Sequence, residues 1–213
     1  MKPILSFALV LACVGPMQAQ TNNFGLAFNL GAPFGDFREK TYAATFEVPV
    51  QQVEGYDIGY GGQLTMSIPL QKSLAFRLGL GGLSTRGTNT AIGFDTIYLR
   101  HNLFFLSAEA QIFFDDAYRH SGTYLVLGLS SNFERFERSF DDDWSYWYSD
   151  RDRDVTRKSR MGGTIGIGHT FYSRYGLNFT TELSYHVTFT NRDINRMEPH
   201  PTDFLKFSFG FVF

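Results

Sequence analysis

The stretch Lys-Phe-Ser-Phe-Gly-Phe-Val-Phe, residues 206–213, alternates large aromatic side chains with small or polar ones. Successive side chains of a β-strand point to opposite faces of a sheet, so this stretch, with Leu205 before it, divides into an apolar stripe and a mixed stripe. A soluble edge strand with such an apolar stripe would promote aggregation. In a closed barrel the apolar stripe would face lipid instead, and only helices and closed barrels satisfy every backbone polar group in a bilayer.

Seven further segments alternate in the same way, which predicts eight strands in all. Their approximate bounds are 22–31, 57–68, 73–81, 104–114, 125–133, 161–171 and 177–189. Residues 94–102 keep the opposite phase from 104–114, so they either continue that strand beyond the bilayer or contain a β-bulge. Side chains just fill the interior of a barrel of this size. The predicted fold is all-β: an eight-stranded antiparallel up-and-down transmembrane β-barrel.

The connections between the predicted strands alternate between short and long. The long ones are about 32–56, 84–94, 134–160 and 190–203. Outer-membrane barrels have short periplasmic turns and long external loops, so the long connections are expected outside the cell. No apolar run reaches the roughly 18 residues of a membrane helix. The predicted location is the outer membrane of a Gram-negative-type envelope.

Residues 1–19 have the pattern of a secretory signal peptide, in which Lys2 precedes an apolar run over 4–14 and Ala19 precedes the expected cleavage point. A lipoprotein-type cleavage before Cys13 is the alternative. Removal of residues 1–19 deletes Cys13, the only cysteine, so the barrel domain 20–213 would form no disulfide and no thiolate site. The formal net charge of −2 becomes −3 without Lys2, which argues against nucleic acid as a partner.

The chain resembles the small eight-stranded outer-membrane barrels of the OmpA/OmpX type through its signal peptide, its amphipathic strands and the terminal FSFGFVF of residues 207–213. The ending, with Phe209, Phe211 and Phe213, resembles the signal read by the barrel-assembly machinery. The resemblance therefore implies three partners: that machinery, outer-membrane lipid and lipopolysaccharide. The resemblance is to the family members that consist of the barrel alone, and no cofactor is expected. A secreted soluble barrel or sandwich is the alternative fold that the same alternation allows.

Four charged side chains fall on inward positions of the predicted strands: Arg77, Glu109, Glu182 and Lys206. Arg77 and Glu109 are expected at similar heights on neighbouring strands, and so are Glu182 and Lys206. Because a buried charge is costly unless it is paired, we expect a salt-bridge network that plugs the lumen. Barrels of the family that the chain resembles tend to carry such a network. A gated ion path through the same charges is the alternative.

The connection 134–160 combines acidic and aromatic residues. Its acidic runs, 141–143 and 150–154, lack the glycine and glutamate of a calcium-binding EF-hand loop, so no metal site is predicted. Between them lies an external aromatic loop with Trp144, Tyr146, Trp147 and Tyr148. Exposed aromatic residues mark binding surfaces, whereas in a hairpin that continues two strands above the bilayer they would pack across it. An external ligand at the loops is compatible with both interpretations.

Small barrels that hydrolyse lipid A carry a His-x-Ser arrangement on a lipid-facing strand. The nearest match, His186-Val187-Thr188, has threonine in place of serine, and both polar side chains are predicted to face inward. His101 and His169 have no evident partner, and such histidines are more often structural. No catalytic residue is assigned. The predicted function is a non-enzymatic, plugged barrel that anchors external loops for envelope integrity or adhesion, and the alternatives are a narrow porin-like pore and a lipid A-modifying hydrolase.

Overall fold

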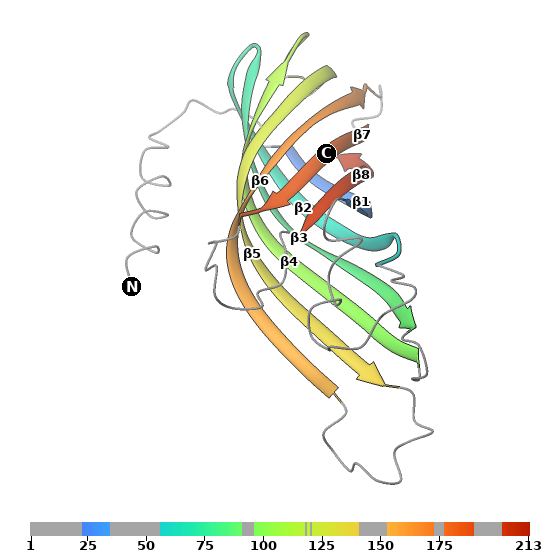
Figure 1. Ribbon diagram of the computed structural model, residues 1–213. Helices are drawn as coiled ribbons and strands as arrows, with labels where there is room; N and C mark the ends of the chain where they lie inside the picture. Colours follow the sequence, from blue (N-terminus) through green and yellow to red (C-terminus); the bar gives the residue numbers. More distant parts are fainter. Residues whose placement is uncertain are drawn as a thin grey trace.

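The computed structural model describes residues 23–34, 56–90, 96–117, 119, 121–140, 153–172, 177–189 and 202–213. Within these residues eight antiparallel strands form one closed barrel in chain order, so the predicted fold class and strand number are confirmed (Figure 1). The strands are β1 (Asn23–Phe34), β2 (Gly59–Gln71), β3 (Leu74–Thr90), β4 (Thr96–Phe113), β5 (Gly122–Phe140), β6 (Arg153–Phe171), β7 (Asn178–Thr188) and β8 (Asp203–Val212). The expected signal peptide lies outside the described residues.

Strands β1 and β8 close the barrel. They pair without interruption from Gly25–Val212 to Phe34–Asp203. Beyond this ladder, the backbones of Phe24 and Phe213 exchange two hydrogen bonds, with N···O distances of 2.9 and 2.8 Å. The aromatic ending of the chain is therefore the last strand of the barrel, bonded to the first strand along its whole length. We call the end of the barrel that contains Phe213 and the short turn after β2 the turn end, and the opposite end the loop end.

The outer surface of the barrel is a belt of exposed apolar side chains. Leu129 on β5 and Ile165 on β6 are 57% and 58% exposed, and Phe209 on β8 is 42% exposed. Such a continuous exposed apolar surface is unstable in water and suits hydrocarbon. Within the described residues, no helix is long and apolar enough to cross a membrane. The closed barrel and its belt place the chain in an outer membrane, with the turn end toward the periplasm.

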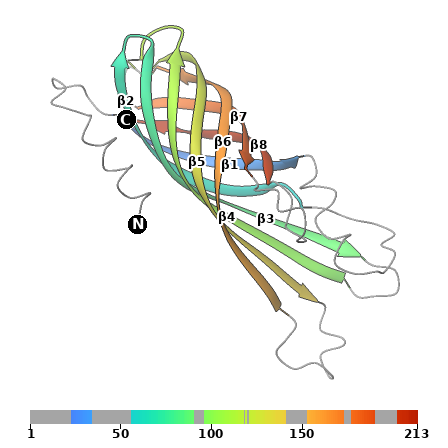
Figure 2. The same ribbon diagram turned by 60° about the vertical axis from the view of Figure 1, so that its left-hand side comes forward.

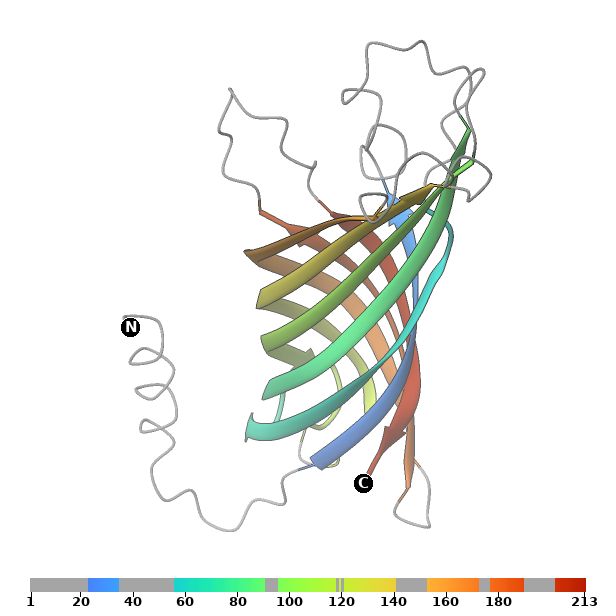
Figure 3. The ribbon, with the colours of Figure 1, turned by 90° about the horizontal axis from the view of Figure 1, so that it is seen from below.

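Four neighbouring strands are much longer than the other four. Strands β3 to β6 have 17, 18, 19 and 19 residues, whereas the remaining strands have 10 to 13. Figures 2 and 3 show that the long strands continue past the barrel on one side as a curved sheet, and that the strands run obliquely around the barrel. We call residues 83–90, 96–103, 134–140 and 153–160 the projecting sheet. On β6, it extends about 30 Å of strand beyond Gly162, which pairs with the last residue of β7.

The pairing of β4 decides between the two interpretations of residues 94–102. Its register with β3 and with β5 is continuous from Ile97 to Ile112, so the strand continues without a bulge. The phase of the apolar residues changes because the surroundings change. In the belt Phe104 and Leu106 face outward, whereas above it Leu99 is buried and Arg100 is exposed. The projecting sheet therefore has the polarity of a soluble sheet, with an apolar inner face and a polar outer face.

Candidate functional site: the interior of the barrel

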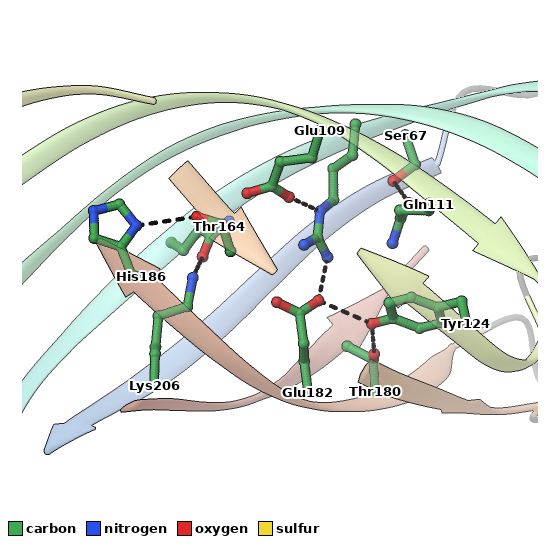
Figure 4. A network of polar contacts seen from close by, with 11 residues as sticks. Ser67, Glu109, Gln111, Tyr124, Thr164, Thr180, Glu182, His186 and Lys206 are labelled. Carbon is green, nitrogen blue, oxygen red and sulfur yellow. Dashed lines mark hydrogen bonds and ion pairs between the residues drawn. The ribbon is translucent and has the colours of Figure 1, made fainter. Parts of the chain in front are cut away.

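Arg77 lies at the centre of the barrel interior and joins its opposite walls. From β3, its Nε atom lies 2.5 Å from Oε2 of Glu109 on β4, and its Nη1 atom lies 2.7 Å from Oε2 of Glu182 on β7 (Figure 4). All three side chains are buried. Strands β3 and β7 are four places apart in a closed barrel of eight strands, so the Arg77–Glu182 pair crosses the whole lumen.

The structure brings Arg77 and Glu109 together for the reason that the sequence suggests, because they are directly opposite each other in the β3–β4 ladder. The expected pair of Glu182 with Lys206 does not form. Lys206 lies opposite Ser184, its Nζ atom donates to Oε1 of Gln63 at 3.2 Å, and it lies 5.2 Å from the centre of the Phe105 ring. The expectation considered only neighbouring strands, whereas the long Arg77 side chain reaches Glu182 from the far wall.

Neutral polar side chains complete the charged layer. The Tyr124 hydroxyl lies 3.1 Å from Oγ1 of Thr180 and donates to Oε2 of Glu182 at 3.3 Å. A cavity of about 20 Å³ lies between these groups and is lined by Arg77 and Gln63, among others. This volume accommodates about one water molecule, and Nη2 of Arg77, which has no protein partner, supplies a donor for it.

Apolar side chains cover the charged layer on both sides, a feature that the sequence analysis missed. At the turn end, one buried cluster consists of Ala75, Phe113, Ala117, Tyr124 and Val126. At the loop end, a second buried cluster consists of Tyr56, Leu83, Leu99, Leu103, Phe105, Phe136 and Phe204. The interior is therefore layered, with ion pairs between two apolar layers, rather than uniformly polar.

A second polar cluster lies within the apolar layer at the loop end. Oε1 of Glu134 lies 3.3 Å from Nε2 of His101, and Oε2 of Glu134 lies 3.0 Å from Nε of Arg160. The Thr202 hydroxyl also donates to Glu134. The imidazole of His101 stacks on Phe136 with ring centres 4.5 Å apart. His101 therefore has a partner, contrary to the sequence analysis.

The electrostatics of this cluster follow from its burial in the projecting sheet. Burial lowers the pKa of His101, and the neighbouring Glu134 carboxylate offsets only part of that effect. Burial alone would raise the pKa of Glu134, but the hydrogen bond and charge of His101 and the charge of Arg160 hold it below its usual value. The sequence analysis missed this cluster because it assigned 134–160 to a loop. The alternation that continues past Phe133, with Glu134 and Phe136 on one face and Arg135 on the other, was the available signal.

The candidate hydrolase residues face the interior rather than lipid. His186 is buried, and its Nδ1 atom lies 3.0 Å from Oγ1 of Thr164. Thr188 is fully buried; its hydroxyl accepts a hydrogen bond from Asn132 at 3.1 Å and lies 2.8 Å from the Thr202 hydroxyl. In the described part of the chain, no group of three or more His, Cys, Asp or Glu side chains is arranged to hold a metal ion. His186 is therefore a buried, hydrogen-bonded side chain of the barrel interior.

The other predicted sites lie away from the interior. Phe209, Phe211 and Phe213 face outward in the apolar belt, where they are 42%, 41% and 63% exposed. Their contribution to assembly stays a prediction. The aromatic loop with Trp144, Tyr146, Trp147 and Tyr148 lies outside the described residues, as do the acidic positions 141–143 and 150–152.

The closed barrel and its apolar belt define a small eight-stranded outer-membrane β-barrel protein, with the fold of the OmpA/OmpX-like barrels. No family model and no curated protein matches the sequence. Among solved structures, the chain is similar to Ail, the attachment invasion locus protein of Yersinia pestis, in complex with the heparin analogue sucrose octasulfate. Sequence identity is 8%, the TM-score is 0.53, and the match covers 90% of this chain and 97% of Ail.

Two Pseudomonas aeruginosa structures are also similar. The N-terminal β-barrel domain of OprF is 15% identical, with a TM-score of 0.45 and coverage of 92% of this chain and 100% of the domain. The outer membrane protein OprG is 12% identical, with a TM-score of 0.42 and coverage of 91% and 97%. At such identities the likeness concerns the fold alone.

Proposed function

We propose that this protein is a non-enzymatic outer-membrane barrel that does not conduct ions and that anchors its projecting sheet and external loops for attachment or envelope integrity. One observation carries the proposal: the Arg77 guanidinium bridges Glu109 and Glu182 across the full width of the lumen. An ion that passed this level would have to separate two buried ion pairs. Separation of one buried pair is strongly unfavourable because it leaves an uncompensated charge.

The layered interior supports a lumen that is closed to ions, independently of the charged side chains. Phe113 and Val126 on the turn side and Leu103 and Phe105 on the loop side are all buried. A hydrated ion would therefore have to displace packed apolar side chains both before and after the ion-paired layer. Hydrophobic constrictions alone close many channels by excluding water.

The projecting sheet supports an external role. It is a rigid extension of four paired strands beyond the belt, and it carries the connection 141–152 between the ends of β5 and β6. The structurally similar Ail is an attachment invasion locus protein. A barrel that serves only as an anchor would have no need of an open lumen, and this agrees with the packing of the interior.

Planar-bilayer recording on the refolded chain tests the closed lumen. The wild-type protein is expected to give no persistent conductance, with unheated gel mobility as the control for a folded barrel. The variant in which Arg77, Glu109 and Glu182 are changed to Ala and buried Lys206 to Met removes the charged layer without leaving an unpaired charge, and it is expected to leak more than the wild type. A stable open channel in the wild type would contradict the proposal and favour a narrow pore.

The external role needs a separate measurement. Cells that display the wild-type chain are expected to adhere to matrix-coated surfaces more strongly than cells that display a variant with Trp144, Tyr146, Trp147 and Tyr148 changed to serine. Equal adhesion would remove the aromatic loop from the proposal. Mass spectrometry of lipid A from cells with and without the protein tests the hydrolase alternative, and an unchanged lipid A spectrum is expected.

A further inference from the structure

The polar cluster around His101 links the projecting sheet to the start of β8. We call it the His101 cluster, and it consists of His101 on β4, Glu134 on β5, Arg160 on β6 and Thr202, the residue before β8. Strand β8 pairs with β1 and β7 in the closed barrel. Side chains rather than a backbone ladder therefore connect it to β4, β5 and β6.

Two contacts hold the start of β8 against the projecting sheet. The Thr202 hydroxyl donates to Glu134, and the Phe204 ring lies nearly parallel to the His101 imidazole, with ring centres 5.8 Å apart. Both Thr202 and Phe204 are buried. The Thr202 carbonyl oxygen accepts a hydrogen bond from the Thr188 amide at 3.2 Å, at the loop end of the β7–β8 pair. A change at His101 or Glu134 therefore acts directly on the start of β8.

The charges of the His101 cluster balance only while the imidazole is neutral. Oε1 of Glu134 lies 3.3 Å from Nε2 of His101, and Oε2 of Glu134 lies 3.0 Å from Nε of Arg160. The carboxylate and the guanidinium already sum to zero, and Lys158 lies directly opposite Glu134 in the β5–β6 ladder. A proton on His101 would therefore give this buried site an excess of positive charge, which is costly away from water.

The described groups that face His101 from the other elements are uncharged. Phe136 on β5 stacks on the imidazole with ring centres 4.5 Å apart, and Tyr56, which precedes β2, meets it edge-on at 6.0 Å. From β3, the Thr85 hydroxyl lies 3.5 Å from the His101 carbonyl oxygen. Together with Phe204, these groups keep water from the ring, and the exposed fraction of His101 is 0%. They offer no second anion that would stabilise an imidazolium.

Separation of β8 from the projecting sheet changes the proton affinity of His101. In the closed arrangement, burial lowers the pKa of His101, the Glu134 carboxylate opposes this shift only in part, and the charge of Arg160 adds to it. In water the imidazole pKa is about 6.5. The separated arrangement thus binds a proton that the closed arrangement excludes, so a fall in pH below about 6.5 favours separation.

We propose that the His101 cluster is a pH-sensitive switch, which holds the start of β8 against the projecting sheet at neutral pH and releases it in mildly acidic surroundings. The surface presented at the loop end then depends on pH, while the ladders of the barrel below stay intact. For one proton, the equilibrium constant for release rises by at most about tenfold for each pH unit below about 6.5. The proposal goes beyond the proposed function and does not depend on whether the lumen conducts.

Amide hydrogen exchange, followed residue by residue by NMR on the full chain in detergent micelles, tests the switch. The Thr188 amide is the reporter, because it donates to the Thr202 carbonyl oxygen. Between pH 7.5 and 5.5, its protection factor, which is corrected for the intrinsic pH dependence of exchange, is expected to fall by up to about tenfold. An unchanged protection factor would overturn the proposal.

Low urea concentrations distinguish local release from unfolding of the whole barrel. Local release exposes little surface, so exchange of the Thr188 amide is expected to be nearly independent of urea at both pH values. The Phe113 amide, which donates to the Ser73 carbonyl oxygen at 2.8 Å near the turn end, is the reference for global unfolding. Equal urea dependence of the two amides would overturn the proposal.

Arg160→Gln tests the charge balance with a substitution that leaves His101 and Glu134 in place. Without the guanidinium, a protonated imidazole gains an ion pair with the carboxylate in a site that stays neutral. The pKa of His101, measured by NMR of its ring, is therefore expected to rise, and the pH dependence of the Thr188 amide is expected to shrink. A His101 side chain that only packed would keep its pKa in this variant, and that result would contradict the switch.

His101→Phe retains an aromatic ring beside Phe136 and Phe204 but binds no proton. In this variant the Thr188 amide is expected to have the same protection at pH 7.5 and 5.5. His169→Gln is the matched control, because it removes a histidine near the turn end and should retain the wild-type pH dependence. Gel mobility of unheated samples checks that each variant is folded. Wild-type pH dependence in His101→Phe, or its loss in His169→Gln, would overturn the proposal.

Discussion

The guanidinium of Arg77 and the carboxylate of Glu182 lie 2.7 Å apart although they come from opposite walls of the barrel and are 105 residues apart in the chain. The sheet itself links each strand only to its two neighbours. This ion pair therefore links two strands, β3 and β7, that no backbone ladder joins. The same guanidinium also holds Glu109, so its loss affects two buried carboxylates at once.

Arg77→Ala is expected to lower the free energy of unfolding by about 3–5 kcal/mol, because it leaves buried carboxylates without a cation. Urea unfolding in detergent micelles, followed by tryptophan fluorescence, measures the change. The matched control is Arg77→Met combined with Glu109→Gln, Glu182→Gln and Lys206→Met, which removes both buried cations and both carboxylates and retains their volume. This control should recover most of the loss. Equal losses in the two variants would show that the ion pairs themselves stabilise the barrel, rather than that Arg77→Ala is harmful because it leaves unpaired carboxylates.

Two adjacent glycines on β2 provide a test of the β2–β3 pairing. A Cβ atom on Gly61 would lie 1.9 Å from the carbonyl oxygen of Gly82, whereas a Cβ atom on Gly62 would meet nothing closer than 3.6 Å. Gly61→Ala is therefore expected to prevent closure of the barrel, and Gly62→Ala should fold like the wild type. Gel mobility of unheated samples distinguishes folded from unfolded chains. A folded Gly61→Ala variant would mean that β2 and β3 are spaced differently.

The extent of the lipid belt is testable with arginine substitutions at two heights. Leu129 is 57% exposed in the middle of the belt on β5, and Tyr98 is 47% exposed on the projecting sheet. Leu129→Arg is expected to cost about 2–4 kcal/mol of folding stability in a bilayer, whereas Tyr98→Arg should cost about 0–1 kcal/mol. Equilibrium unfolding in phospholipid vesicles measures both. Similar costs would place the belt boundary elsewhere.

Stability is expected to fall as the pH drops below about 6.5, the unperturbed pKa of histidine. The pKa of buried His101 is lower in the folded protein than in the unfolded chain, so the unfolded state binds more protons in this range and gains stability from acidification. Glu134 also has a lowered pKa and acts in the same direction, but only at more acidic pH, near and below the usual carboxyl pKa. Unfolding midpoints at pH 7.5 and 5.5 should differ less in His101→Gln than in the wild type. An unchanged difference would exclude His101 as a contributor.

The belt was predictable from the sequence because lipid outside and polar groups inside impose opposite demands on alternate residues. Leu125, Leu127 and Leu129 alternate with Val126 and Gly128, and this alone identifies a strand. The ends of β3, β5 and β6 were assigned to long connections, and 94–102 on β4 were predicted as either a continuation of the strand or a β-bulge. Water replaces lipid outside the projecting sheet, so the phase of the apolar residues reverses there, with Leu99 facing inward and Arg100 outward.

The site was predictable only to the extent that it depends on neighbouring strands. The register of one hairpin brings Arg77 to Glu109, and similar heights along two adjacent strands suggested this contact. The Arg77–Glu182 and Lys206–Gln63 contacts cross the lumen, and their geometry depends on barrel diameter and side-chain reach. The contact between His101 and Glu134 was not predicted because the predicted strand 125–133 ended one residue before Glu134, although the alternation continues past that point.

Four exposed arginines on the outer face of the projecting sheet also affect how the barrel reaches its final position. A chain that inserts from the periplasmic side must carry Arg86, Arg100, Arg135 and Arg157 through the hydrocarbon before they reach the far surface. At about 2–4 kcal/mol for each arginine at the bilayer midplane, the passage adds a kinetic barrier on the order of 10 kcal/mol. Once the strands have crossed the bilayer, the same barrier opposes their return, so the polar outer face of the projecting sheet slows the loss of the barrel from the membrane.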